Sequence, residues 1–181
     1  MRKLKLQVQL SVDGYIAGVN GEMDWMTANW DDALKEFVTR LTDPVDLILL
    51  GRKLAEGFIP FWASNPALEG AAKMNNTFKI VFTNTIEKCE WNNTALAKGK
   101  LVDEVTSLKK EAGGDIIVYG GGSFVSSLIR SGMIDDFYLF INPAVLGKGM
   151  PIFNQVETTQ NLTLVESRSF PCGITCLHYH K

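Results

Sequence analysis

The sequence predicts an α/β domain with a mainly parallel sheet and an antiparallel edge formed by its C-terminal strands. Short apolar runs such as DLILL (46–50) and DIIVY (115–119) are typical of strands that are buried on both faces. Segments with helical spacing of apolar residues alternate with these runs, and parallel strands need such crossover helices. Two final strand-like segments, 162–170 and 174–180, follow each other closely and indicate an antiparallel pair.

The first half of the chain begins with an expected strand at 4–12, which ends at the turn Asp13-Gly14. A short extended piece at 15–18 and a loop rich in glycine and asparagine follow. Residues 30–41 are expected to form a helix, because apolar side chains recur at helical spacing and acidic residues occupy the first turn.

The buried run 46–50 meets Gly51, after which RKLAEGF begins a short helix. The next stretch, 59–77, contains two prolines and is expected to be rich in loops. A strand is then expected at 79–85 and a helix within 99–114.

The strand at 115–119 leads through three glycines into a second helix, SFVSSLIRSG, with Gly132 placed to end it. Residues 135–153 contain a strand followed by a loop rich in Gly and Pro. There is no repeat, low-complexity tract or interdomain linker, so residues 1–181 are predicted to form a single domain.

Composition excludes several classes of protein. The formal net charge of −2 gives no basic excess for nucleic-acid binding, and no apolar run reaches the 18 or so residues of a membrane span. Polar residues interrupt any signal-peptide core near the N-terminus. A cytoplasmic protein that acts on a small molecule is therefore expected.

The three cysteines are expected to be reduced thiols. If 174–180 is a strand, Cys176, His178 and His180 lie on one face. Ligands at that spacing on one strand are about 7 Å apart, too far for one ion without bending. No metal site is therefore predicted, although a metal-binding module at these residues is an alternative.

Two places combine a buried strand, glycine and the start of a helix: one at Gly51, and one at 120–123 (GGGS). A helix N-terminus has free N–H groups and suits phosphate oxygens, and glycine lets the backbone approach a ligand. Both sites would lie at the carboxyl ends of parallel strands, where ligands of open sheets collect. The alternative is that the glycines form tight turns. Three glycines in a row favour a pyrophosphate or dinucleotide, although neither a Walker loop nor a complete G-x-G-x-x-G is present.

The strand ending FTNT carries Thr83, Asn84 and no acid of the kind that holds the ribose hydroxyls of NAD. Arg52 and Lys53 are available for an additional phosphate. NADPH is therefore favoured as the cofactor.

The motifs SVDGYIAG, GRKLAEG, IVFTNT, YGGGSFVSSLI and FINPAVLGKGMPIF occur in this order over nearly the whole chain. Together they resemble the dihydrofolate reductase-like superfamily, and specifically its RibD C-terminal domain branch, the riboflavin-biosynthesis reductase domain and its stand-alone relatives. The resemblance implies a three-layer α/β/α fold with a mainly parallel sheet, a homodimer, and an NADPH-dependent oxidoreductase that reduces C=N or C=O. In the RibD reaction the substrate is a ribosylaminouracil 5′-phosphate.

The resemblance also implies site residues. The expected cofactor contacts are Ile16, Ala17, Gly51, Arg52, Lys53, Leu54, Thr83, Asn84, Gly120, Gly121, Gly122, Ser123, Phe124 and Val125. A cis peptide bond is expected between Gly120 and Gly121. The expected substrate contacts are Gln9, Trp25 and Lys148, although a lysine between two glycines is also typical of a solvated loop. Asp24 is the candidate catalytic group, which orients substrate or passes a proton through water; the alternative is a loop or capping residue.

Two positions depart from the folate reductases. Leu54 replaces a threonine, and Phe140 replaces the threonine that supports the pterin-binding carboxylate, which is expected near residues 30–32. Three functions are therefore considered: a reductase of a small heterocyclic or ribosylamino-pyrimidine substrate, a non-catalytic NADP-binding domain, and a dihydrofolate reductase-type enzyme.

Overall fold

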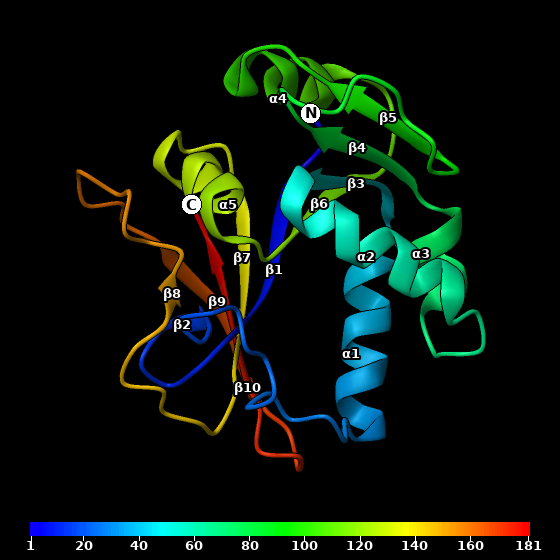
Figure 1. Cartoon of the computed structure of the whole chain (residues 1–181). Helices are drawn as coiled ribbons and strands as arrows, with labels where there is room; N and C mark the ends of the chain where they lie inside the picture. The colour runs from blue at the N-terminus through cyan, green and yellow to red at the C-terminus, as the bar shows by residue number, and fades with distance from the viewer.

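The computed structural model describes all 181 residues and contains a mixed eight-stranded sheet with helices on both faces (Figure 1). The strands are β1 Leu4–Leu10, β2 Tyr15–Ala17, β3 Val45–Gly51, β4 Phe78–Phe82, β5 Thr94–Ala97, β6 Asp115–Tyr119, β7 Asp136–Ile141, β8 Met150–Pro151, β9 Thr163–Ser169 and β10 Thr175–His180. The helices are α1 Asp32–Thr42, α2 Arg52–Ser64, α3 Ala71–Asn76, α4 Leu101–Lys110 and α5 Gly122–Arg130.

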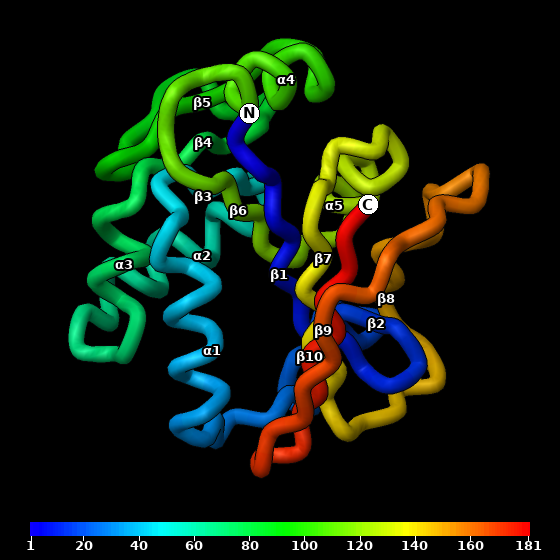
Figure 2. Tube along the Cα trace, turned by 180° about the vertical axis from the view of Figure 1, so that it is seen from behind, coloured from blue at the N-terminus to red at the C-terminus, as the bar shows by residue number.

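The strand order is β5-β4-β3-β6-β1-β7-β10-β9, and β2 and β8 form a separate two-stranded sheet. The six strands from β5 to β7 run parallel, while β10 and β9 are antiparallel to their neighbours. Figure 2 shows β9 and β10 on one side of β1 and the strands β3, β4 and β5 on the other. The predicted fold class is confirmed.

Alternation along the central strands explains the three layers. In β3, Leu47 and Leu49 belong to a cluster with residues of α4 and α5, whereas Ile48 and Leu50 belong to a cluster with α2. A third cluster joins α1 to β7 and β10. A strand buried on both faces therefore needs helices on both sides of the sheet.

The loop-rich expectation for 59–77 is wrong for 59–64 and 71–76, which are helical, whereas residues 65–70 form turns. Helix α2 continues to Ser64 with Pro60 inside it, and α3 follows. An interior proline weakens a helix by about 3 kcal/mol or more, but Ala55 and Ile59 are buried against the sheet on the same helix. Their burial favours the helix over the local preference of proline. The short strand β5 was also missed, and β4 ends earlier than the predicted residue 85.

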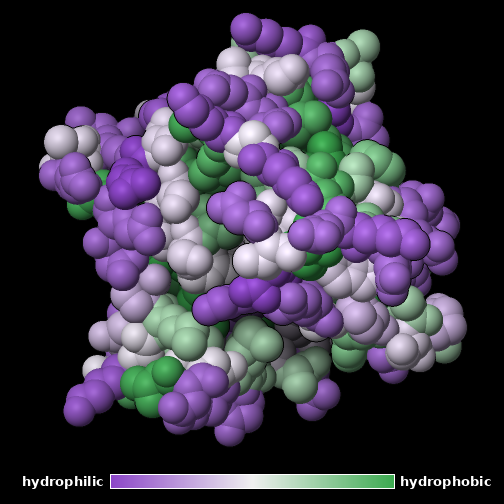
Figure 3. Space-filling view, turned by 45° about the horizontal axis from the view of Figure 1, so that its top comes forward, coloured by the Kyte–Doolittle hydropathy of each residue, from purple (hydrophilic) through white to green (hydrophobic).

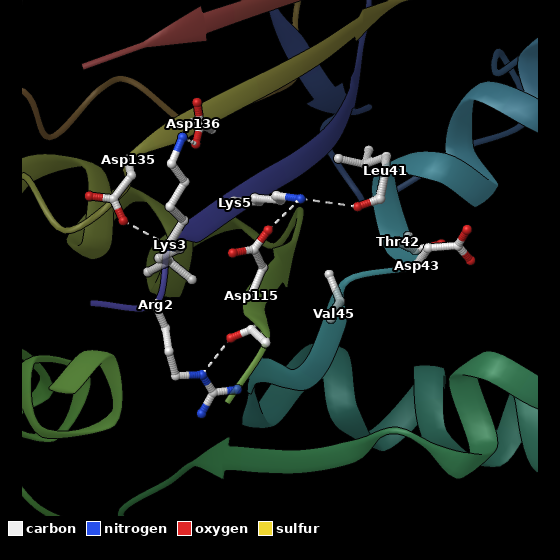
Figure 4. Close-up of polar contacts among 12 residues, drawn as sticks. Arg2, Lys3, Lys5, Leu41, Thr42, Asp43, Val45, Asp115, Asp135 and Asp136 are labelled. Carbon is white, nitrogen blue, oxygen red and sulfur yellow. Dashed lines mark hydrogen bonds and ion pairs between the residues drawn. The ribbon is translucent and has the colours of Figure 1, made fainter. Parts of the chain in front are cut away.

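Ion pairs join the amino ends of the central strands (Figure 4). The Nζ atom of Lys5 lies 2.7 Å from a carboxylate oxygen of Asp115 and 3.2 Å from the carbonyl oxygen of Leu41. Lys3 pairs with the buried Asp136 on β7 at 3.2 Å. These contacts connect β1 to β6, β7 and α1.

None of the helices has the length and hydropathy that crossing a bilayer requires. The face shown in Figure 3 carries mostly hydrophilic residues, with apolar atoms visible in separate patches between them.

Candidate functional site

The two predicted phosphate sites meet at the carboxyl edge of the sheet. Helix α2 begins directly after β3, helix α5 begins after β6, and these two strands are parallel neighbours. A Cβ atom added to Gly51 would lie 2.7 Å from the Cβ atom of Phe124, and one added to Gly121 would lie 3.6 Å from Cδ2 of Leu54. The first turns of the two helices therefore contact each other.

Neither helix has a side chain that caps its N-terminus: Gly51 and Gly121 occupy the N-cap positions. The first-turn N–H groups of a helix have no partners within the helix, and together they carry a partial positive charge. Two such ends side by side form a site suited to an anion with several oxygens, such as a pyrophosphate.

The glycines at this edge serve different purposes. A Cβ atom on Gly120 would lie 2.8 Å from Cγ2 of Val8, and one on Gly51 would collide with Phe124. Both are required by the packing of the protein itself. Of the three consecutive glycines at 120–122, only Gly122 has nothing within 4 Å of its added Cβ atom, so it faces open space.

The expected cis bond between Gly120 and Gly121 is wrong, because the structure contains no cis peptide bond. The N–H group of Gly120 continues the ladder to β1 by donating to the carbonyl of Gln7 at 3.1 Å. Gly121 has a φ of 178°, which is extended backbone. The chain enters α5 directly from the extended strand.

The strand end FTNT forms a turn held by Thr83. Its Oγ1 atom accepts hydrogen bonds from the N–H groups of Thr85 and Ile86 at 3.1 and 3.0 Å. Asn84 next to it is exposed. The Phe82 ring lies 5.0 Å from the Phe124 ring, so this strand end adjoins the first turn of α5.

The basic residues of α2 lie at the surface. Arg52 pairs with Glu56 at 2.8 Å, one turn further along the helix, while Lys53 is exposed. A pair at this spacing on an exposed helix contributes only about 0.3–0.5 kcal/mol, so Glu56 is easily replaced by a phosphate.

The strand β2 pairs with β8, which places Ala17 opposite Met150. Asp13 connects the same two segments: its carboxylate accepts the N–H groups of Gly147 and Leu146 at 2.7 and 3.1 Å. A hydrogen bond from Ser11, supported by these N–H groups, lowers the pKa of Asp13. This contact was not predicted, although Ser-x-Asp-Gly indicates an Asp-stabilised turn.

Asn142 is a second residue that the sequence analysis missed. It is fully buried, donates to Oε1 of Gln9 at 2.8 Å and accepts the N–H group of Thr27 at 3.0 Å. It therefore fixes the loop that follows Trp25 against β1. No local sequence signal identifies it, because its partners lie 133 and 115 residues away.

The other predicted substrate and catalytic residues occupy the two connecting loops. Trp25 is partly buried and donates its indole N–H group to the carbonyl of Glu22 at 3.0 Å. Asp24 and Lys148 are exposed. Their chemical contributions remain predictions.

The segment in which a pterin-binding carboxylate is expected makes its contacts within the protein. Asp31 caps α1 by accepting the N–H group of Leu34 at 2.9 Å, and its second oxygen accepts the N–H group of Cys172 at 2.8 Å. The bond from Leu34 is the main cause of a lowered pKa for Asp31. Phe140 is buried against Phe37 at 6.1 Å between ring centroids.

The Cys and His side chains on one face of β10 make contacts within the protein. Rings of His178 and His180 both lie 3.1 Å from the same oxygen of Asp136. Cys176 is buried, and burial raises the pKa of its thiol to about 12. No group of three or more His, Cys, Asp or Glu side chains is arranged to hold a metal ion.

A mainly parallel sheet with helices on both faces and two uncapped helix ends at its carboxyl edge defines an open α/β protein, a class that binds ligands at that edge. The chain belongs to the RibD C-terminal domain family, whose model matches residues 2–176. It is 32% identical over 183 residues to YyaP of Bacillus subtilis, an uncharacterized protein, covering 99% of this chain and 95% of that one.

Solved structures agree with this family. A putative riboflavin biosynthesis protein from Shewanella sp. PV-4 is 26% identical, with a TM-score of 0.78 over 99% of this chain and 98% of its own. A diaminohydroxyphosphoribosylaminopyrimidine deaminase/5-amino-6-(5-phosphoribosylamino)uracil reductase from Thermotoga maritima shares the fold at 17% identity. Its TM-score is 0.70, over 99% of this chain and 56% of that larger chain.

Proposed function

We propose that the protein is an NADPH-dependent reductase that transfers hydride to a C=N or C=O carbon of a small heterocyclic or ribosylamino-pyrimidine substrate. A substrate similar to 5-amino-6-(5-phosphoribosylamino)uracil is consistent with the family and with the reductase named for the Thermotoga structure. The observation that carries the proposal is the contact between two uncapped helix ends at the carboxyl edge of β3 and β6.

The residues present fit the cofactor. The N–H groups at the starts of α2 and α5 would bind the phosphate oxygens, and the open space beside Gly122 admits the pyrophosphate. Lys53, and Arg52 after exchange of its partner Glu56, would bind the 2′-phosphate. When bound, NADPH supplies the hydride.

The substrate would lie beside Ile16 and Ala17, against the polar side chains of β1. Gln9 is held by the hydrogen bond that its Oε1 atom accepts from Asn142, and its remaining amide NH2 group would contact the substrate. The loop that contains Asp24 and Trp25 is attached through Thr27 to the same asparagine. We propose that Asp24 orients the substrate or passes a proton to it through water, while this loop limits the access of solvent.

A non-catalytic NADP-binding domain is the second candidate. It is favoured by one observation: the carboxylate at the start of α1 is already used to cap the helix and bind Cys172. The same observation disfavours dihydrofolate reductase activity. A homodimer and a cytoplasmic location remain predictions.

The test measures NADPH binding and oxidation separately. At 100 times its Kd, a ligand stabilises the fold by about 2.7 kcal/mol, which corresponds to a rise in melting temperature of about 5–10 °C for a chain of this size. NADH, which lacks the 2′-phosphate, serves as the matched control. Oxidation of NADPH with a ribosylaminopyrimidine supports the reductase, and binding without oxidation of any tested substrate supports the second candidate. No thermal shift with NADPH would contradict both.

A further inference from the structure

One buried acceptor in the protein lacks a partner. The Oε1 atom of Gln7 is the only buried side-chain nitrogen or oxygen without a hydrogen bond, and the residue is 8% exposed. A buried polar atom left unpaired destabilises a fold, and native proteins seldom retain one without a reason. Gln7 does not belong to the predicted site residues.

Gln7 lies on the face of the sheet that carries α1 and α2. Its neighbours Leu6 and Val8 point into the opposite cluster, which contains residues of α4 and α5. Because side chains alternate along a strand, Gln7 points the other way. The strand register places it between Tyr119 of β6 and Tyr138 of β7.

This face is divided at β1. One apolar cluster joins α2 to β3, β4 and β6, with Tyr119 packed against it, and a separate cluster joins α1 to β7 and β10, with Tyr138 packed against it. The residues of β1 between these clusters are polar. They are Lys5, Gln7 and Gln9. A strip of polar side chains between two helices of one layer is suited to a polar ligand more than to core packing.

The side chains around Gln7 make their recorded contacts with other residues. Lys5 binds Asp115 and the carbonyl of Leu41 (Figure 4). Gln9 accepts from Asn142. The Tyr119 hydroxyl donates to the sulfur of Met74 at 3.5 Å, and the Tyr138 ring stacks on His178 at 4.0 Å. None of these neighbours donates a hydrogen bond to Oε1 of Gln7.

We propose that Oε1 of Gln7 accepts a hydrogen bond from an N–H group of the substrate and thereby selects a nitrogen heterocycle that carries such a donor. Gln9, one alternation nearer the cofactor edge, is about 7 Å away along the strand. That separation suits one pyrimidine ring with its substituents. The assignment of this strip as the substrate site rests on the proposed function.

Uracil and 1,3-dimethyluracil are suitable probes, because the second keeps the ring and both carbonyls but has no N–H group. Binding is measured by titration with NMR detection in the presence of NADPH. The wild-type protein is expected to prefer uracil. Gln7→Met removes the acceptor at similar volume and is expected to weaken uracil binding about tenfold, equivalent to about 1.4 kcal/mol. Binding of 1,3-dimethyluracil is expected to be unchanged.

Gln7→Glu keeps an acceptor and is expected to retain uracil binding within a few-fold. Gln155→Met, the same kind of substitution on the loop that follows β8, is the control. Without ligand, Gln7→Met is expected to melt at or above the wild-type temperature, since the unpaired acceptor is gone. A lower melting temperature with unchanged uracil binding would assign Gln7 a structural role and overturn the proposal. Failure of the wild type to bind uracil would overturn it as well.

Thermal shifts with NADPH on the same samples distinguish the two proposals. A normal NADPH shift with no contrast between Gln7 variants refutes only the assignment of Gln7. If uracil binding differs between the Gln7 variants but NADPH does not raise the melting temperature, only the proposed cofactor is refuted.

Discussion

Replacing the glycines at the start of α5 one at a time separates packing from ligand binding. In Gly120→Ala the new methyl group would lie 2.8 Å from Cγ2 of Val8, a distance that forces the strand or the valine to move. Val8 is 3% exposed and belongs to the main core cluster. Overpacking of this kind costs about 1–3 kcal/mol, so the melting temperature is expected to fall by about 2–12 °C.

In Gly122→Ala the methyl group enters open space, and the residue already lies in the first turn of the helix. Alanine stabilises such a position by about 0.4–1 kcal/mol through the unfolded chain. The same methyl group would occupy the space proposed for the pyrophosphate. NADPH affinity is therefore expected to fall at least about tenfold, equivalent to 1.4 kcal/mol, while the melting temperature holds or rises.

Urea denaturation with and without NADPH measures both quantities on each variant. The expected pattern is a loss of stability for Gly120→Ala, and a loss of cofactor affinity without a loss of stability for Gly122→Ala. If Gly122→Ala bound NADPH as tightly as the wild type, the open space would not be the pyrophosphate site. If Gly120→Ala were as stable as the wild type, the packing argument would be refuted.

Three further predictions concern the edges of the site. Lys53→Glu is expected to weaken NADPH binding at least about tenfold and NADH binding much less, since the lysine is proposed to bind the 2′-phosphate that NADH lacks. Equal losses for both cofactors in parallel titrations would exclude this role. Asn142→Ala removes the partners of Gln9 and Thr27 and is expected to destabilise the protein by about 1–3 kcal/mol in urea titrations; an unchanged midpoint would mean that water replaces the amide. The pKa of Asp13 is lowered in the fold below its ordinary value of 3.8. The carboxylate therefore accepts the N–H groups of Leu146 and Gly147 fully above pH 3.8, and these hydrogen bonds are lost as the pH falls through the lower folded pKa. Hydrogen exchange of those two amides, corrected for intrinsic rates, is expected to accelerate in that acid range. In Asp13→Ala, which has no side-chain acceptor, exchange is expected to be fast at all pH values, and protection of the wild type that does not depend on pH would contradict this.

Local sequence patterns determined the strands that are buried on both faces. The runs at 46–50 and 115–119 lie within β3 and β6, and each is followed by a helix whose N-cap residue is glycine. Such patterns depend on neighbours within a few residues, so they can be recognised without the fold. The order of the motifs also indicated the family that the comparisons confirm.

Tertiary contacts decided what the local patterns could not. The helix α2 continues through Pro60 because Ile59 is buried against the sheet. The carboxylate of Asp31 is occupied by an N–H group of Cys172, 141 residues away. Whether a polar side chain is paired or free depends on partners brought together only by folding.

The glycines show the same division. The run of three glycines predicted a helix entrance suited to phosphate, and the structure places two uncapped helix ends in contact there. Only the fold distinguishes Gly120, which makes room for Val8, from Gly122, which faces open space. The physical reason is that a missing Cβ atom has meaning only relative to the atoms that would surround it, and those atoms come from other strands and helices.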